Sequence, residues 1–546
     1  MSKNEADILE KQAMDKTTDS LNDAPLANED AQRLAQLGHE QELRRQYSLI
    51  SLGALCLCLG ATWEALSTVV VTALVNGGAP CVFYNYILSA IFSICTAASL
   101  GEIASIYPTA GGTLPFSPTL CSLLTRLSGQ YHWVAAMAPS SICSSASFMT
   151  GWISIGGQIV LTASAAFAAG LESQSLIIVN DSSYVPERWQ GLLFYWAVLV
   201  YALILNIWGQ RALPWHNHVS GIIHVGGFVI VVIVLGVMAP KNTSSFVFKE
   251  VTNQSGWADD GVSWLVGLLS SVYPFLGYDA ACHLAEEMPH ASRNVPIAMI
   301  GSVGINGFLG LVYVIILLYS AGPLETLVKT PTGYPFMQIF LDATKSPVGT
   351  TLLSLLIILV AAAATVAGTT STSRTLWAFA RDRSTPWDKQ LSKVNKRHEV
   401  PVYAVVVTVV LQMLLGFIYL GNTTAFNAFL SMAIIGMYTS YALPIVAMLF
   451  YRKHLQSTNA FGPFRLGRVV GPLINIISLI WIIVVVIFSA FPSVMPVTAQ
   501  NMNYSVVVMA FWVLVGALYY GIWGKKKYQV PNVDMAVLDG ARDSGN

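Results

Sequence analysis

The amino-acid sequence predicts an all-α integral membrane protein with twelve transmembrane helices, and three observations support this prediction. Hydrophobic residues make up 54% of the 546 residues and charged residues only 11%, whereas soluble domains carry about 25% charged residues. The mean hydropathy of the whole chain is +0.58. The apolar residues also gather in stretches of roughly 20, which is the length that crosses a bilayer as a helix.

Twelve apolar stretches follow one another along the chain, separated by polar or charged turns. We expect transmembrane helices at residues 48–75, 80–107, 142–168, 190–208, 217–239, 262–281, 297–321, 351–373, 401–420, 425–450, 470–492 and 504–523. The polar segment 1–47 contains no apolar core and is expected to be a disordered cytosolic tail. A second cytosolic tail is expected at residues 524–546.

Lysine and arginine are distributed unevenly between the two sets of loops. Most of the 29 basic residues fall in the loops and tails expected on the inner side. The loops expected on the outer side carry only Arg188, Lys241, Lys249, Lys329 and Lys345. Because cytosolic loops are enriched in Lys and Arg, this bias predicts that both termini are cytosolic. The glycosylation sequons at Asn180, Asn242 and Asn253 then lie in outer loops.

The first and sixth apolar stretches contain breaks at corresponding places. Gly60 and Ala61 interrupt the first stretch, while Pro274 and Gly277 interrupt the sixth. Backbone groups freed by such breaks have no partner in lipid and normally face a polar cavity. Paired breaks five helices apart are typical of a transporter built from two inverted five-helix repeats, with its substrate near the bilayer midplane. For Gly60 alone, close helix packing is the alternative interpretation.

Four segments resemble signature sequences of the fungal amino acid/choline permease family, which belongs to the amino acid, polyamine and organocation superfamily. They are LAQLGHEQELRRQYS at 34–48, SLGEIASIYPTAGG at 99–112, GYDAACHLAEEMPHASRNVP at 277–296 and TSRTLWAFARDRSTPW at 372–387. The resemblance implies a LeuT-like fold, in which two intertwined inverted repeats, 48–239 and 262–450, precede two further helices at 470–523. It also implies uptake of small amines such as GABA, choline or amino acids, usually with protons.

This resemblance is interrupted after Gly112. Similar proteins continue from AGG directly into QYHWV, whereas here TLPFSPTLCSLLTRLSG intervenes at residues 113–129. A short unspliced intron that keeps the reading frame and lacks a stop codon would produce such a segment. A retained intron is therefore our leading hypothesis for this atypical insertion, and a genuine cytosolic loop is the alternative. Sequencing the cDNA decides between them.

The two helix breaks predict the substrate site. A break exposes N–H groups that suit a carboxylate and C=O groups that suit an ammonium, and cations also rest on aromatic faces. We expect the substrate carboxylate at the first break and the ammonium at the second. The predicted substrate-binding residues are Gly60, Ala61, Thr62, Trp63, Glu64, Tyr273, Phe275, Gly277 and Tyr278. For any single aromatic residue among them, core or lipid packing is the alternative.

Three titratable residues within apolar stretches are candidates for proton coupling. Glu64 lies near the middle of the first stretch and has no Lys or Arg close to it in sequence. It should therefore bind a proton or neutralise a cationic substrate. Asp279 and His224 are the other two candidates. For each of the three residues, a buried structural hydrogen-bonding role is the alternative.

Charged residues at the inner ends of the predicted helices are candidates for an inner gate. They are Glu102, Glu286, Glu287, Arg293, Arg374 and Arg381. Ion pairs among them would lock the inward-facing side. The alternative is that they belong to solvated turns and only follow the inside-positive charge bias.

Other function classes find less support in the sequence. No cofactor loop, His/Cys metal cluster or nucleophile motif is recognisable, so we expect neither an enzyme nor a resident cofactor or metal. Zero net charge gives no argument for a nucleic-acid partner. We therefore expect a proton-coupled permease of the plasma membrane that takes an amino acid, GABA or choline and has protons and lipid as its other partners. The alternative is a nutrient sensor of the same fold that does not transport.

Overall fold

The computed structural model describes residues 49–107, 129–285, 291–395, 397, 399–421, 425–458 and 461–530. These described residues form helices, one isolated β-bridge between Asn395 and Val400, and no strand. Eleven helical stretches among them are long and apolar enough to cross a membrane. The prediction of an all-helical, multi-pass membrane protein is therefore confirmed.

The helices fall into a long set and a short set. The long helices are α2 (Leu49–Gly60), α3 (Thr62–Ile106), α6 (Cys143–Asn180), α7 (Arg188–Trp208), α8 (Leu213–Met238), α13 (Ala291–Tyr319), α16 (Pro347–Arg381), α18 (Val402–Leu415), α20 (Ala425–Thr458), α21 (Val470–Ser489) and α22 (Ser505–Tyr519). The short helices are α5 (Gln130–Met137), α9 (Ser244–Phe248), α10 (Asp260–Val266), α11 (Leu268–Val272), α12 (Ala280–His283), α14 (Leu324–Val328), α15 (Pro335–Thr344), α17 (Asp388–Leu391), α19 (Ile418–Gly421), α23 (Lys525–Lys527), the 3₁₀ helices η1 (Gln210–Ala212) and η2 (Tyr273–Phe275), and the π-helix η4 (Tyr520–Gly524).

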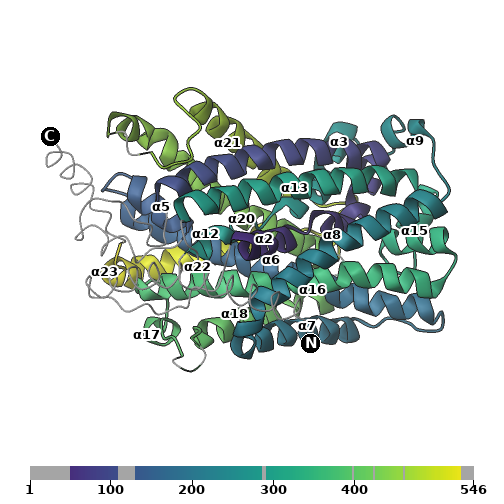
Figure 1. Ribbon diagram of the computed structural model, residues 1–546, viewed down its shortest axis with the longest axis horizontal. Coiled ribbons are helices and arrows are strands. Elements are labelled where there is room, and N and C mark those ends of the chain that lie inside the picture. The colour runs from purple at the N-terminus through teal and green to yellow at the C-terminus, as the bar shows by residue number, and fades with distance from the viewer. Residues whose placement is uncertain are drawn as a thin grey trace, which may run out of the picture.

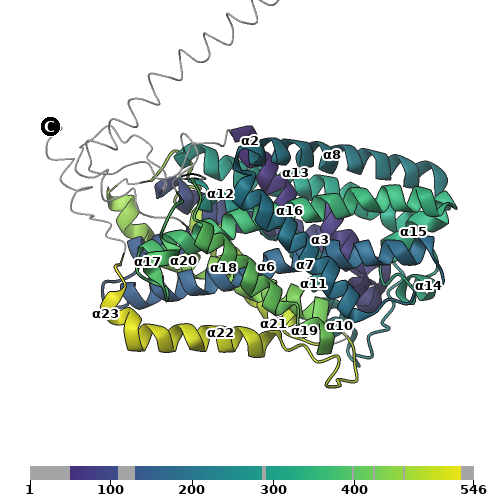
Figure 2. The same cartoon turned by 90° about the horizontal axis from the view of Figure 1, so that it is seen from below.

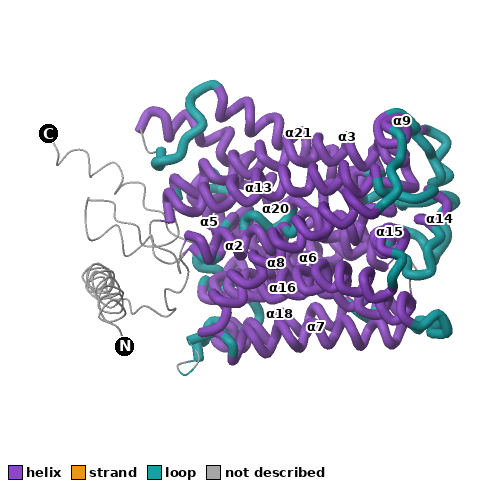
Figure 3. The backbone as a smooth tube through the Cα atoms, turned by 45° about the vertical axis from the view of Figure 1, so that its right-hand side comes forward, coloured by secondary structure: helices purple, strands orange, loops and turns teal. Residues whose placement is uncertain are grey.

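The long helices lie side by side along the longest axis of the molecule (Figure 1). Several short helices and loops lie at its two ends, with α9, α14 and α15 at one end and α5 at the other (Figure 3), whereas α12 lies within the bundle (Figure 1). Helices α17 and α23 lie at the same end as α5 (Figure 1). This segregation is expected in a bilayer, because irregular backbone exposed to lipid would leave its polar groups without partners.

The first apolar stretch, Ser51–Ile106, is 56 residues long. As a straight helix it would measure about 84 Å, against a hydrocarbon core of about 30 Å. It is broken at two places, since Ala61 has a left-handed conformation (φ 37°, ψ 52°) and Gly78 has φ 73° and ψ −161°. The break at Gly78 falls between the two helices expected at 48–75 and 80–107. A Cβ atom at Gly78 would lie 2.6 Å from the hydroxyl of Thr252, so glycine is required there.

Three helices run well past the ends expected from hydropathy. Helix α6 continues to Asn180 rather than 168, α16 to Arg381 rather than 373, and α20 to Thr458 rather than 450. The apolar run of α6 stops where polar residues such as Glu172 and Gln174 enter the sequence. Both are buried among other helices. Hydropathy reports exposure to lipid, so it ends a helix too early where the helix is surrounded by protein.

The centre of the bundle is formed by α3, α6, α13, α16 and α20. In α6, 94% of the most apolar window is buried, against 17% in Ser505–Lys527. Helix α22 accordingly lies along one edge of the bundle, opposite α8 (Figure 2). Gly157 of α6 packs directly on α20, because a Cβ atom there would lie 2.8 Å from the carbonyl carbon of Gly436. Small residues permit this close approach between membrane helices.

Candidate functional site

The two predicted breaks lie against each other in the centre of the bundle. In the first, α2 ends at Gly60 and α3 begins at Thr62. In the second, η2 ends at Phe275, and Gly277 has a left-handed φ of 94° before α12 begins at Ala280. The hydroxyl of Thr62 donates to the carbonyl of Pro274 (3.4 Å). A Cβ atom at Gly277 would lie 2.9 Å from the Leu59 side chain, so the breaks are in van der Waals contact.

A cavity opens beside the two breaks. Its lining residues are Leu59, Gly60, Ala61, Glu64, Ala65, Thr68, Leu161, Ala165, Ala168, Tyr273, Leu276, Ala361 and Ala364. Four of the predicted substrate-binding residues are among them: Gly60, Ala61, Glu64 and Tyr273. The walls come from α2, α3, α6, the second break and α16. The cavity is mostly apolar and carries a few convergent polar groups, as small-molecule sites usually do.

The other five predicted substrate-binding residues are buried next to the cavity without lining it. Trp63 donates from its indole N–H to the carbonyl of His224 (3.3 Å). Thr62 bonds the second break, and Gly277 packs on α2. Phe275 packs against Tyr86, with ring centroids 5.2 Å apart, and Tyr278 packs against Tyr441 at 5.4 Å. In this conformation, the aromatic residues among them therefore pack around the breaks and do not form the cavity wall.

Glu64 and His224, two separate candidates for proton coupling, form a pair. The Oε1 atom of Glu64 lies 2.8 Å from Nδ1 of His224, although the residues are 160 positions apart. Both side chains are fully buried, and the Trp63 ring stacks on the imidazole. The imidazole of His224 also interacts with the side chain of Asn306. Within the described part of the chain, Oε2 of Glu64 has no hydrogen-bond partner. The pair can share or exchange a proton and still offer this oxygen to a ligand.

A second carboxylate, Glu172 of α6, lies close to this pair and was missed by the sequence analysis. The hydroxyl of Thr68 donates to its Oε1 atom (2.6 Å). Thr68 itself lines the cavity. The residue lies beyond the predicted end of its helix at 168, so it was assigned to a loop. Its spacing from Ala168 and Ala165, one and two turns earlier, was the signal that could have placed it on the same helical face.

Asp279 lies away from the cavity and joins several helices. Its Oδ1 atom accepts a hydrogen bond from the hydroxyl of Tyr441 on α20 (2.7 Å). Its Oδ2 atom accepts from the amide of Gln130 on α5 (2.7 Å) and lies 3.0 Å from Nε2 of His283. The His283 ring also lies 3.0 Å from the amide nitrogen of Gln158 on α6. These contacts hold the segment after the second break against three other elements.

Among the predicted gate residues, Glu102 forms a buried ion pair with Arg452, a residue that the sequence analysis did not select. Nη1 and Nη2 of Arg452 lie 2.6 and 3.1 Å from the two carboxylate oxygens. The backbone N–H of Leu466 also donates to Glu102 (2.7 Å). The pair therefore ties the end of α3 to the end of α20 and to the loop that follows it.

The remaining gate candidates do not join the Glu102–Arg452 pair. Arg293 is exposed at the start of α13, and Arg374 is buried on α16. The Arg381 guanidinium lies over the Trp377 ring, 4.4 Å from its centroid. Glu286 and Glu287 lie outside the described residues, as does the segment 113–128.

We predict that breaking the Glu102–Arg452 pair destabilises the protein strongly. Glu102→Gln should lower the free energy of unfolding by about 3–5 kcal/mol, because it leaves a buried guanidinium without its counter-charge. The measurement is thermal unfolding of the purified protein in detergent. The double variant Glu102→Gln, Arg452→Gln should regain part of the loss, since it removes the uncompensated charge as well. Additive losses in the double variant would contradict this account.

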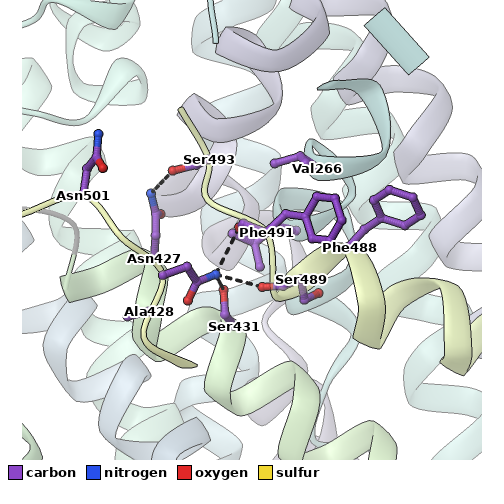
Figure 4. A pocket seen from close by; sticks show the side chains of 11 residues that line it. Val266, Asn427, Ala428, Ser431, Phe488, Ser489, Phe491, Ser493 and Asn501 are labelled. Carbon is purple, nitrogen blue, oxygen red and sulfur yellow. Dashed lines mark hydrogen bonds between the residues drawn. The ribbon is translucent and has the colours of Figure 1, made fainter. Parts of the chain in front are cut away.

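A second pocket lies between α20, α10, α11 and the loop after α21. It is lined by several amide and hydroxyl side chains, among them Asn427, Ser431, Ser493, Asn501 and Asn503. The amide of Asn427 donates to Ser493 (3.2 Å), as Figure 4 shows. The Asn503 amide donates to Ser431 and to the carbonyls of Ser489 and Phe491. Because these groups bond one another, the pocket anchors a loop and is less suited to bind a solute.

Comparisons with known proteins agree with this architecture. Residues 49–512 match the model of the amino acid permease family. The chain is 30% identical over 506 residues to a choline transporter of Saccharomyces cerevisiae, and the aligned region covers 92% of this chain and 86% of that protein. It is 29% identical over 518 residues to an amino-acid permease of Arabidopsis thaliana, covering 91% and 95%. The chain therefore belongs to the amino acid permease family of the amino acid, polyamine and organocation superfamily, a family of membrane transporters.

Proposed function

We propose that this protein is a secondary active transporter that imports a small amine-bearing solute. This solute is either choline or an amino acid, for example GABA. The observation that carries the proposal is the contact between the two helix breaks beside a cavity that holds Glu64. Broken membrane helices normally surround a solute or ion site, because lipid cannot satisfy the backbone groups that they free. The names of two relatives, a choline transporter and an amino-acid permease, point to the same class of solute.

The proposed architecture has twelve transmembrane helices. The stretch Ser51–Ile106 would cross the membrane twice, once on each side of Gly78, which adds one crossing to the eleven apolar stretches. Residues 48–239 and 262–450 would be two inverted repeats, with 470–523 as the last two helices. The location of one break in the first helix of each half supports this division. The inside-positive charge bias supports cytosolic termini, and a plasma-membrane address completes the proposal.

The proposed substrate site is the cavity together with the two breaks. A substrate ammonium would lie beside Glu64 and the ring of Tyr273, both of which line the cavity. A substrate carboxylate, where one is present, would lie at the start of α3, whose free N–H groups carry the positive end of the helix dipole. Residues Thr62, Trp63, Phe275, Gly277 and Tyr278 would hold the breaks in place.

Alternating access would move the broken segments relative to α6 and α16. The contacts of Asp279 and the Glu102–Arg452 pair lie at the end of the molecule that we assign to the cytosol, so both are proposed as parts of the inner gate. Proton symport would use the Glu64–His224 pair, because a buried carboxyl next to an imidazole can take up and release a proton. Asp279 is retained as a further proton-coupling candidate.

The test is uptake of labelled GABA, choline and a panel of amino acids by cells that lack their own permeases. The full chain and a variant without 113–129 should be compared at two external pH values. We expect accumulation above equilibrium that increases at acid pH. Binding without accumulation, in a protein shown to reach the cell surface, would contradict the proposed transport. If only the shortened variant transports, the insertion is an unspliced remnant.

A further inference from the structure

Glu172 continues the face of α6 that lines the cavity. Leu161, Ala165 and Ala168 are the lining residues of this helix. They are spaced by four and three positions, and Glu172 follows after four more, which places it on the same face one turn further along. On α3 the lining face ends at Thr68, whose hydroxyl bonds Glu172. The two lining faces therefore converge at Glu172, at one end of the cavity.

The carboxylate of Glu172 is buried and incompletely bonded. The residue has 0% of its surface exposed. Oε1 accepts the hydrogen bond from Thr68, whereas Oε2 has no partner among the described residues. A buried carboxylate with one unpaired oxygen is costly unless a counter-charge or a donor arrives. This is the situation of a group that completes its bonding only when a ligand is present.

Glu172 has no counter-charge around the cavity. Glu64 is paired with His224, and a protonated imidazole would neutralise it. None of the ion pairs found in the described part of the chain brings a lysine or arginine to Glu64, Glu172 or His224. Burial without a counter-charge favours the protonated, neutral form of the Glu172 carboxyl while the cavity is empty. A bound solute with one net positive charge would supply the missing counter-charge and favour the ionised form, whereas a zwitterion brings its own carboxylate.

The segment after α14 covers the far side of Glu172. Ser175, almost one turn beyond Glu172 on α6, donates from its hydroxyl to the carbonyl of Thr332 (2.8 Å). Tyr334, two residues later, is buried. This segment leads into α15, which lies at the opposite end of the molecule from α5 (Figure 3). Glu172 thus stands between the cavity and the side from which an imported solute would enter.

We propose that Glu172 is the specificity-determining residue of this site and selects solutes with a net positive charge over neutral or zwitterionic solutes of the same shape. This inference rests on the proposed function, since it assigns the charge class of the transported amine. Glu64 and His224 would take up and release the proton, and Glu172 would balance the charge of the bound solute. Because its charge acts across a water-poor interior, it is screened far less than a surface carboxylate.

Three probes of similar shape separate charge from fit. Choline carries one positive charge, glycine betaine keeps the trimethylammonium group but adds a carboxylate, and 3,3-dimethyl-1-butanol replaces the trimethylammonium group by a neutral tert-butyl group. The measurement is the rise in unfolding temperature of the purified full chain as each probe is titrated. It reports binding without requiring transport, so absent uptake would count against the proposed function and leave this readout unaffected.

The wild-type protein should be stabilised by choline at concentrations at least about tenfold lower than by either of the two probes without net charge. Glu172→Gln keeps the size of the side chain and an oxygen that can accept from Thr68. This substitution should reduce the preference for choline to about threefold or less, mainly because it weakens the binding of choline. The control is Glu325→Gln, the same change at an exposed position on α14, which should keep the full preference.

Two results would overturn the inference. The first is a wild-type protein that binds the three probes equally well, and this comparison holds even if Glu172→Gln does not fold. The second is a folded Glu172→Gln protein that keeps the wild-type preference for choline. Glu172→Asp provides a further check, since it retains the negative charge and should retain most of the preference.

Discussion

Glu64→Gln should abolish accumulation of the substrate against its gradient and leave some exchange across the membrane. Glutamine has nearly the same shape, and its side-chain oxygen can still accept a hydrogen bond from His224, which lies 2.8 Å from Glu64. It cannot gain or lose a proton. The substitution therefore removes the proposed coupling step while preserving the walls of the cavity, which Glu64 lines. The measurement is labelled uptake at two external pH values, together with exchange from preloaded cells.

The exposed Glu325→Gln variant serves as the matched control and should transport like the wild type. Surface expression of both variants is measured in the same cells. An unchanged dependence of Glu64→Gln uptake on external pH would remove Glu64 from proton coupling. Loss of exchange together with accumulation would instead assign Glu64 mainly to substrate binding.

The location of the two helix breaks could be predicted because glycine and proline act locally. Gly60, Pro274 and Gly277 stand inside apolar stretches that would otherwise be uninterrupted helices. Their effect on the backbone depends on their own φ and ψ angles, so it can be recognised without knowledge of neighbours. The conformation of Ala61 was less predictable, since alanine has no preference for the left-handed region that it occupies.

Pairings between distant residues could not be predicted in the same way. Glu64 and His224 were each selected as titratable residues in apolar stretches, but nothing in the sequence indicates that they are partners. Arg452 follows a stretch expected to end at 450, so it was one of many basic residues at inner helix ends. A single sequence gives the chemistry of each residue, and only the packing of α3 against α20 brings Glu102 to this particular arginine.

Glu172 was missed for a different reason. Prediction of membrane helices relies on hydropathy, which assumes that the surroundings of a helix are lipid. Helix α6 is enclosed by other helices for most of its length, so it can carry a carboxylate and amides and still be buried. Hydropathy therefore assigns a buried polar residue near a helix end, such as Glu172, to a loop, and helical spacing from the last apolar residues is the better guide.

Gly60→Val should reduce uptake to the background of cells without the protein. A Cβ atom at this position would lie 2.9 Å from Nδ2 of Asn306 on α13. That amide donates to the carbonyl of Leu57 in the last turn of α2, so the clash reaches the backbone at the break itself. Gly60 also lines the cavity, and a branched side chain would fill the space beside Glu64. Both effects act on the proposed site.

Gly53→Val is the matched control, because it makes the same substitution two turns earlier on α2. A Cβ atom at Gly53 meets no atom within 4 Å, and the residue is half-buried like Gly60. The two variants therefore share the change in side chain and helix, and differ in whether the added atoms reach the break. We expect Gly53→Val to transport normally and Gly60→Val to reach the cell surface without transporting. Normal uptake by Gly60→Val at the surface would place the substrate elsewhere, since a site formed by this break has no room for a valine.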